Sequence, residues 1–73
     1  MTQPVSSQRA ALEKAVVTYG GLWDTERGLR ALRDAGYEPQ EKNTRAILRG
    51  LAAAGPLVKV EDHPVRYRAT RAG

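Results

Sequence analysis

The stretch TRAILRGLAAAGPLVKV occupies residues 44–60, and VRYRAT follows at residues 65–70. In its first half, apolar side chains recur at three- and four-residue spacing, which is the period of an amphipathic helix. In its second half, apolar and charged residues alternate as they do in a strand. Gly55 and Pro56 separate the two patterns, because glycine accepts a left-handed cap and proline cannot continue a helix. The stretch therefore predicts a helix that leads directly into a β-hairpin.

The predicted hairpin covers residues 57–70, and the turn residues Glu61 to Pro64 lie at its centre. An isolated hairpin is marginally stable in water, so we expect it to pack on the helices, with Leu22-Trp23 as a short third strand. The alternation predicts one face that covers the helices and a second face that carries three cations. The covering face comprises Val58, Val60, Val65, Tyr67 and Ala69, and the cationic face comprises Lys59, Arg66 and Arg68.

Three helices are predicted before the hairpin, each with a residue at its start that suits that position and a glycine after its end. The first runs from a cap at Ser6 or Ser7 to Tyr19, the second from a cap at Asp24 or Thr25 to about Ala35, and the third from about Pro39 to Ala54.

The helical spacing and the aromatic residues predict the core. One turn residue, Tyr37, is expected to be partly exposed. The candidate core residues are Leu12, Ala15, Val16, Tyr19, Trp23, Leu29, Leu32, Tyr37, Thr44, Ile47, Leu48, Leu51, Ala54 and Tyr67.

Length and composition indicate one small domain. A chain of 73 residues supplies one modest core, and the absence of cysteine leaves stability to packing rather than to disulfides. We expect residues 1–5 to form a flexible lead, residues 6–70 the domain and residues 71–73 a tail. The fold class predicted is α+β, with three helices followed by a two-stranded hairpin.

This order of elements resembles the winged helix-turn-helix family over residues 6–70. Leu51 and Gly55 are similar to the "leucine, three residues, glycine" ending of that family's recognition helix. Residues 57–60 look like the apolar first strand of its wing, and residues 65–70 like a second strand centred on tyrosine. The resemblance implies a small winged helix-turn-helix domain that binds duplex DNA, although the family also includes protein-binding modules.

Two departures from the family pattern bear on how the wing would be used. Pro56 is inserted between the helix end and the strand, and Glu61 and Asp62 occupy the wing tip. Because two carboxylates would repel a phosphate backbone, we expect that the wing does not enter a groove tip-first.

Charge is distributed unevenly along the chain. Residues 1–41 carry five basic and six acidic side chains, whereas residues 42–73 carry seven basic and two acidic ones. Cations gather where a protein meets a polyanion, so this asymmetry favours nucleic acid as a partner. An unevenly charged solvated surface is the alternative interpretation.

The exposed side of the third helix is the strongest candidate for contact with DNA, because the major groove admits an α-helix. Arg45 and Arg49 lie four residues apart on that side, and arginine suits bidentate contact to guanine edges or phosphate. Near the helix start, Gln40, Lys42 and Asn43 are candidates for base-edge contact. The alternative is an ordinary solvated helix face.

The hairpin cations Lys59, Arg66 and Arg68, together with Arg71 in the tail and the second-helix arginines, are candidates for neutralising phosphates, which positions a protein without reading sequence. The alternative is a strand face kept charged against edge-to-edge aggregation. These residues predict a sequence-specific or structural duplex-DNA-binding protein, of the kind used as a small transcriptional regulator. A homodimer would double the limited contacts of one domain.

The competing hypothesis is a winged-helix module that docks on a protein partner, such as a replication, transcription or host factor, without binding DNA. It rests on the acidic wing tip, the modest net charge of +4, and Ala46, Gly50 and Ala53, which leave part of the third helix small and smooth. The sequence contains no recognisable catalytic set and no cofactor motif, and its single histidine, His63, without cysteine cannot make a zinc site. We therefore predict a non-enzymatic cytoplasmic protein without metal, cofactor or membrane partner.

Overall fold

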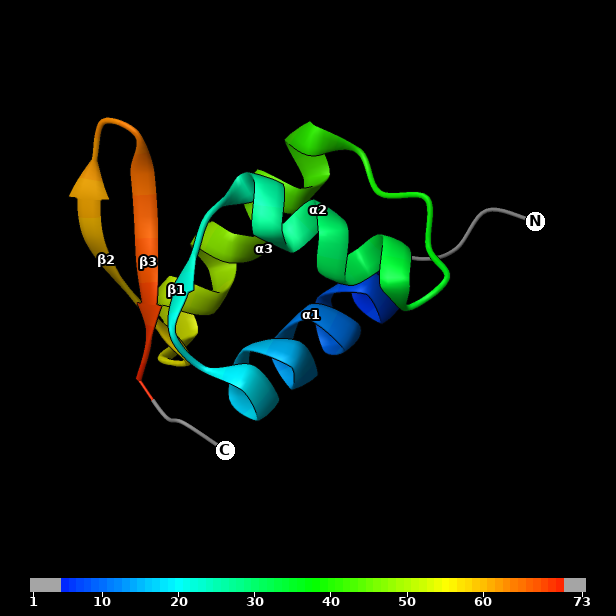
Figure 1. Cartoon of the computed structure of the whole chain (residues 1–73), viewed down its shortest axis with the longest axis horizontal. Helices are drawn as coiled ribbons and strands as arrows, with labels where there is room; N and C mark the ends of the chain where they lie inside the picture. The colour runs from blue at the N-terminus through cyan, green and yellow to red at the C-terminus, as the bar shows by residue number, and fades with distance from the viewer. Residues whose placement is uncertain (1–4, 71–73) are drawn as a thin grey trace.

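The computed structural model describes residues 5–70, which form an α+β arrangement of three helices and a three-stranded antiparallel sheet. Figure 1 shows the sheet at one end of the helical layer, with the hairpin standing beyond β1. Of the predicted lead at residues 1–5, residues 1–4 lie outside the described residues, as does the predicted tail at residues 71–73. The elements are α1 (Val5–Tyr19), β1 (Leu22–Trp23), α2 (Thr25–Asp34), α3 (Glu41–Ala54), β2 (Leu57–Asp62) and β3 (Val65–Ala69).

Two predicted helix starts are wrong. The first helix is already formed at Val5, so Ser6 and Ser7 lie in its first turn instead of capping it. The third helix begins at Glu41, because the backbone of Gln40 is extended and Pro39 precedes it outside the helix. The start of α2 is as predicted, since the Asp24 side chain accepts a hydrogen bond from the Arg27 backbone N–H at 2.8 Å.

Glycines end the helices where the sequence places them. The Gly20-Gly21 pair has φ values of 63° and 80°, and it turns the chain from α1 into β1. At the end of α3, Gly55 has a φ of 116° and donates its N–H to the Leu51 carbonyl at 3.0 Å. This left-handed cap and Pro56 end the helix, and β2 begins at the next residue, Leu57.

The predicted third strand is confirmed, and the sheet order is β1-β3-β2. Leu22 and Trp23 pair with Arg68 and Tyr67 of β3. On the other side of β3, Leu57 pairs with Ala69, and the β2 register shifts at an irregularity between Lys59 and Glu61.

The prediction for the β2 faces is wrong. Leu57 is 1% exposed and occupies the inward position, so its neighbour Val58 faces outward and is 48% exposed. Val60, at the irregularity, is 44% exposed. Lys59 lies opposite Tyr67 and so shares the inward face with that buried ring, whereas Val58 shares the outward face with Arg68.

The core lies where the sheet meets the three helices. Trp23 fills its centre, and its indole N–H donates to the Gly20 carbonyl at 3.0 Å. Two predicted core residues are exposed, Tyr19 at the end of α1 (72% exposed) and Ala54 in the last turn of α3. Leu29, Tyr37 and Ala15 are half-buried. The buried apolar side chains among the described residues are Leu12, Val16, Trp23, Leu32, Ile47, Leu48, Leu51, Leu57 and Tyr67.

The surroundings of two helical glycines predict different effects of adding a methyl group. A Cβ on Gly28 would lie 2.8 Å from Cγ2 of the buried Thr44, whereas a Cβ on Gly50 would lie 3.1 Å from the mobile guanidinium end of Arg9. We expect Gly28→Ala to lower the free energy of unfolding by about 1–2 kcal/mol through overpacking. Gly50→Ala should leave it unchanged or raise it by up to ~1 kcal/mol, because alanine favours helix. Urea unfolding of both variants tests this, and a stabilising Gly28→Ala would contradict the packing.

The hydroxyl of Thr44 predicts a second effect on stability. Thr44 is fully buried and its Oγ1 has no hydrogen-bond partner within the described residues. Because a buried hydroxyl without a partner is costly, we expect the isosteric change Thr44→Val to raise the free energy of unfolding by about 1 kcal/mol. A thermal melt measures the change. A decrease of similar size would instead reveal a hydrogen bond made by the hydroxyl.

Candidate nucleic-acid interface

Four cationic side chains from α3 and β2 line one groove. Lys42, Arg45 and Arg49 come from the exposed side of α3, and Lys59 comes from the inward face of β2. The groove has a volume of about 410 Å³, and its apolar lining includes Leu48, Val65 and Tyr67. Thr25 and Asp62 are its other polar lining residues.

The register of β2 brings Lys59 to this groove. Since Leu57 is buried against the helices, the residue two positions later returns to the same face and lies opposite Tyr67. The prediction that Lys59 shares a face with Arg66 and Arg68 is therefore wrong. The position of Leu57 directly after the Gly55-Pro56 helix end is the sequence signal that indicates the correct register.

Two of the groove cations have carboxylate partners. Arg45 Nη1 lies 3.2 Å from Glu41 Oε1 one turn earlier in α3, and Lys59 Nζ lies 2.7 Å from Asp62 Oδ1. Both pairs are solvent-exposed, with side-chain exposures of 54% and 64% in the first and 53% and 68% in the second. Exposed ion pairs of this kind contribute little to stability, because water and salt screen them. Separating either carboxylate from its cation therefore costs little free energy.

The carboxylate of Asp62 also affects the titration of Lys59. Its hydrogen bond and then its Coulomb attraction raise the pKa of Lys59 above the ordinary value of 10.5. Because the folded-state pKa is the higher one, the pair stabilises the fold at pH below 10.5, and this contribution disappears as pH rises through the raised pKa. Lys59 therefore stays fully charged near neutral pH.

The other predicted contact residues lie outside this groove. Asn43 is half-buried, about 100° around the helix from Lys42. Its side-chain amide donates weakly to Gln40 Oε1 at 3.5 Å, which links these two residues at the N-terminal end of α3. Arg66 and Arg68 lie on the outward face of the sheet, where Arg66 Nη1 is 3.6 Å from Glu61 Oε1.

The three arginines of α2 differ in their surroundings. The guanidinium of Arg27 stacks over the Trp23 ring at 4.1 Å and donates to the Leu22 carbonyl, so this side chain is engaged in the fold. Arg30 and Arg33 are exposed. Arg27 is therefore not available as a phosphate clamp without losing its cation–π contact.

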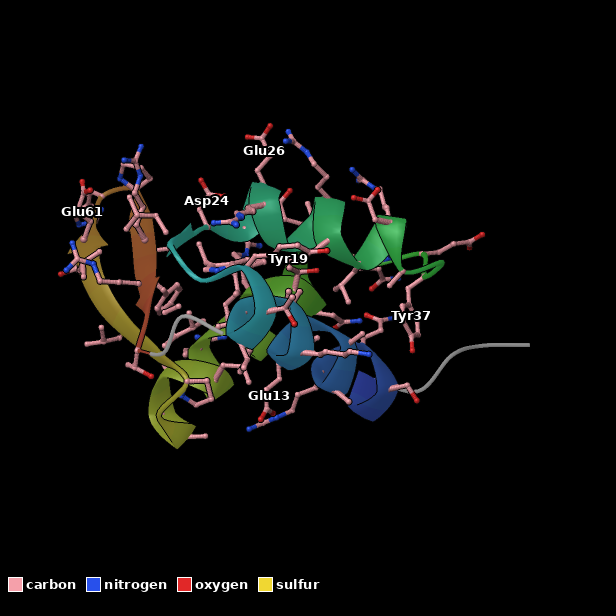
Figure 2. All side chains as sticks on the ribbon, turned by 60° about the horizontal axis from the view of Figure 1, so that its bottom comes forward. Glu13, Tyr19, Asp24, Glu26, Tyr37 and Glu61 are labelled. Carbon is pink, nitrogen blue, oxygen red and sulfur yellow. The ribbon has the colours of Figure 1, made fainter. Side chains whose placement is uncertain are left out.

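A second, larger groove lies between α1 and α2, and no pattern in the sequence predicts it. Its volume is about 700 Å³, and alanines at positions 11, 15, 31 and 35 contribute to its lining. Tyr19 borders it with a 72% exposed ring, and Figure 2 shows this residue and Tyr37 at different places on the surface. The charged lining residues of both signs are Lys14, Asp24, Glu26, Arg27, Arg30 and Asp34.

Comparison of the chain with protein families, with curated proteins and with solved structures finds no match. Within residues 5–70, no group of three or more His, Cys, Asp or Glu side chains is placed to hold a metal ion. None of the helices in that range has the length and apolar character that a membrane crossing requires. The geometry of the two grooves is therefore the basis for assigning a function.

The Lys59–Asp62 contact predicts a change in titration. We expect Asp62→Asn to lower the pKa of Lys59 back toward 10.5, because the variant loses the charged acceptor that holds the ammonium in its protonated form. An NMR titration of the lysine side-chain resonances measures this shift. Glu61→Gln is the control, since Glu61 pairs with Arg66 on the other face and should leave Lys59 unaffected. An unchanged pKa in Asp62→Asn would show that the pair does not form in solution.

Proposed function

We propose that this chain binds duplex DNA through α3 and the adjoining inward face of β2. The observation that carries the proposal is the convergence of Lys42, Arg45, Arg49 and Lys59 on one groove. Cations that converge from two elements can neutralise neighbouring phosphates, whereas cations spread over a surface serve solubility.

The arrangement supports a winged helix-turn-helix mode of binding. In this proposal α3 enters the major groove, which is about 12 Å wide and admits a helix. Arg45 and Arg49 contact guanine edges or phosphate, and Lys59 reaches the backbone beside the helix. Gln40 and Asn43, at the N-terminal end of α3, are the proposed base-edge readers. A small transcriptional regulator is the role proposed for such a protein.

The charges at the wing tip favour contact of DNA with the side of the hairpin rather than insertion of the tip into a DNA groove. Glu61 and Asp62 lie at the end of β2 next to the His63-Pro64 turn. Their charges oppose entry of the tip into a DNA groove, and the groove-facing Lys59 lies one pair further along the strand. The hairpin is therefore proposed to lie along the backbone.

A matched pair of double variants tests this function. Arg45→Ala/Arg49→Ala removes two positive charges from the groove, and Arg66→Ala/Arg68→Ala removes two from the outward sheet face. We expect the first to weaken binding to a random-sequence duplex about tenfold or more at low salt, and to reduce the slope of log affinity against log salt by about 0.9 to 1.8, which corresponds to one or two phosphate contacts. The second should change both quantities much less. Fluorescence anisotropy at several salt concentrations measures them, with thermal melts as controls of folding.

Equal losses of affinity in the two double variants would show that net charge alone governs binding, and would contradict the proposed role of the groove. Absence of binding by the unmodified protein at the lowest salt would contradict DNA binding itself.

The α1–α2 groove favours a second candidate function, docking on a protein. Its volume of about 700 Å³, its alanine lining and the exposed ring of Tyr19 are features of a surface that receives side chains from a partner. Arg45 and Arg49 lie outside this groove. Loss of a protein partner in Tyr19→Ala, with DNA binding unchanged, would support this function as a separate one.

A further inference from the structure

The groove between α3 and β2 brings carboxylates as well as cations together. Arg45 and Lys59 each have a carboxylate within ion-pair distance, Glu41 at 3.2 Å and Asp62 at 2.7 Å. Lys42 and Arg49, the other two lining cations, make no ion pair within residues 5–70. The groove thus contains two cations that are partly neutralised and two that are not.

We propose that Glu41 and Asp62 are specificity-determining residues that compete with DNA phosphates for Arg45 and Lys59, and so limit the sequence-independent part of the affinity. This inference rests on the proposed DNA-binding function. Each carboxylate lies beside its cation in the same element, Glu41 four residues before Arg45 in α3 and Asp62 three residues after Lys59 in β2.

The competition follows from an exchange of ions. A phosphate that binds Arg45 or Lys59 must displace the carboxylate, and the freed carboxylate then attracts a salt cation from solution. That uptake offsets the counterion released from the DNA, so a paired cation contributes less to the salt dependence than an unpaired one. The exposure of both pairs makes the exchange accessible without any change in the fold.

The exchange affects specificity because phosphate contacts are the same for every DNA sequence. Weakening them lowers binding to random duplex, while contacts to base edges keep their full effect. Residues Gln40 and Asn43 at the N-terminal end of α3 make no ion pair and are not subject to this competition. The carboxylates therefore raise the share of the binding free energy that depends on sequence.

The third exposed ion pair provides an internal control. Glu61 pairs with Arg66 at 3.6 Å on the outward face, although it is adjacent to Asp62 in the chain. Figure 2 shows Glu61 on the hairpin and Glu13 on α1, at separate places on the surface. Glu13 is exposed and lines neither groove. Neutralising these two residues raises the net charge and removes one tip carboxylate without changing the lining of the groove, so the control accounts for both effects.

The experiment compares Glu41→Gln/Asp62→Asn with Glu13→Gln/Glu61→Gln, which raises the net charge by the same amount. Affinity for a labelled random-sequence duplex is measured by fluorescence anisotropy between 50 and 200 mM salt. We expect the groove variant to bind more tightly than the unmodified protein, with a salt slope steeper by about 1.8, so that its advantage shrinks about tenfold over this range. Each single variant, Glu41→Gln or Asp62→Asn, should show about half of the added slope.

The outcomes separate the two proposals. If the unmodified protein binds duplex DNA with a salt-dependent affinity but the groove variant matches the control, the competition is wrong and the DNA-binding function stands. If neither protein binds at the lowest salt, the proposed function fails and the competition fails with it. Thermal melts confirm that each variant is folded. If the double variant unfolds, the salt slopes of the single variants test the competition instead.

Discussion

Burial of Leu57 is the constraint on which the arrangement of the hairpin side chains depends. The left-handed cap at Gly55 ends α3 and Pro56 prevents its continuation, so the first strand residue meets the helical core at once. With Leu57 inward, the period of two turns Val58 outward and Lys59 inward, and pairing of Leu57 with Ala69 fixes the matching faces of β3. The cation that faces α3 is thus determined by an apolar contact two residues earlier.

This constraint explains which parts of the structure the sequence could predict. The helix periods, the Asp24 cap and the glycine helix ends are local signals, and α2, the third strand and the buried side of α3 follow them. The faces of β2 are different, because Val58-Lys59-Val60 alternates equally well in either register. Burial of Leu57 directly after the helix end chooses between the two, and the alternation within residues 58–60 does not by itself contain that information.

The candidate site likewise combines residues that local sequence signals place correctly with residues whose position depends on the strand register. Lys42, Arg45 and Arg49 could be placed together from helical geometry alone, since residues three and four apart share a face. Joining Lys59 to them, and separating Arg66 and Arg68, required the strand register. The helical spacing from Leu12 and Val16 predicts Tyr19 in the core. Tyr19 is instead exposed as the last residue of α1, and the turn at Gly20-Gly21 brings Trp23 into the interior.

The two faces of the sheet differ in how their positive charges are arranged. The inward face contributes Lys59 to a groove already cationic through α3, whereas the outward face combines Arg66 and Arg68 with the half-exposed Leu22 and Val58. A polyanion is attracted most strongly where cations converge over a concave surface, because the surrounding protein excludes water and focuses the field there. Cations interleaved with aliphatic side chains on an open sheet lack that focusing. Although both faces carry positive charge, their geometry therefore makes the α3–β2 groove, rather than the outward face, the site proposed for a phosphate backbone.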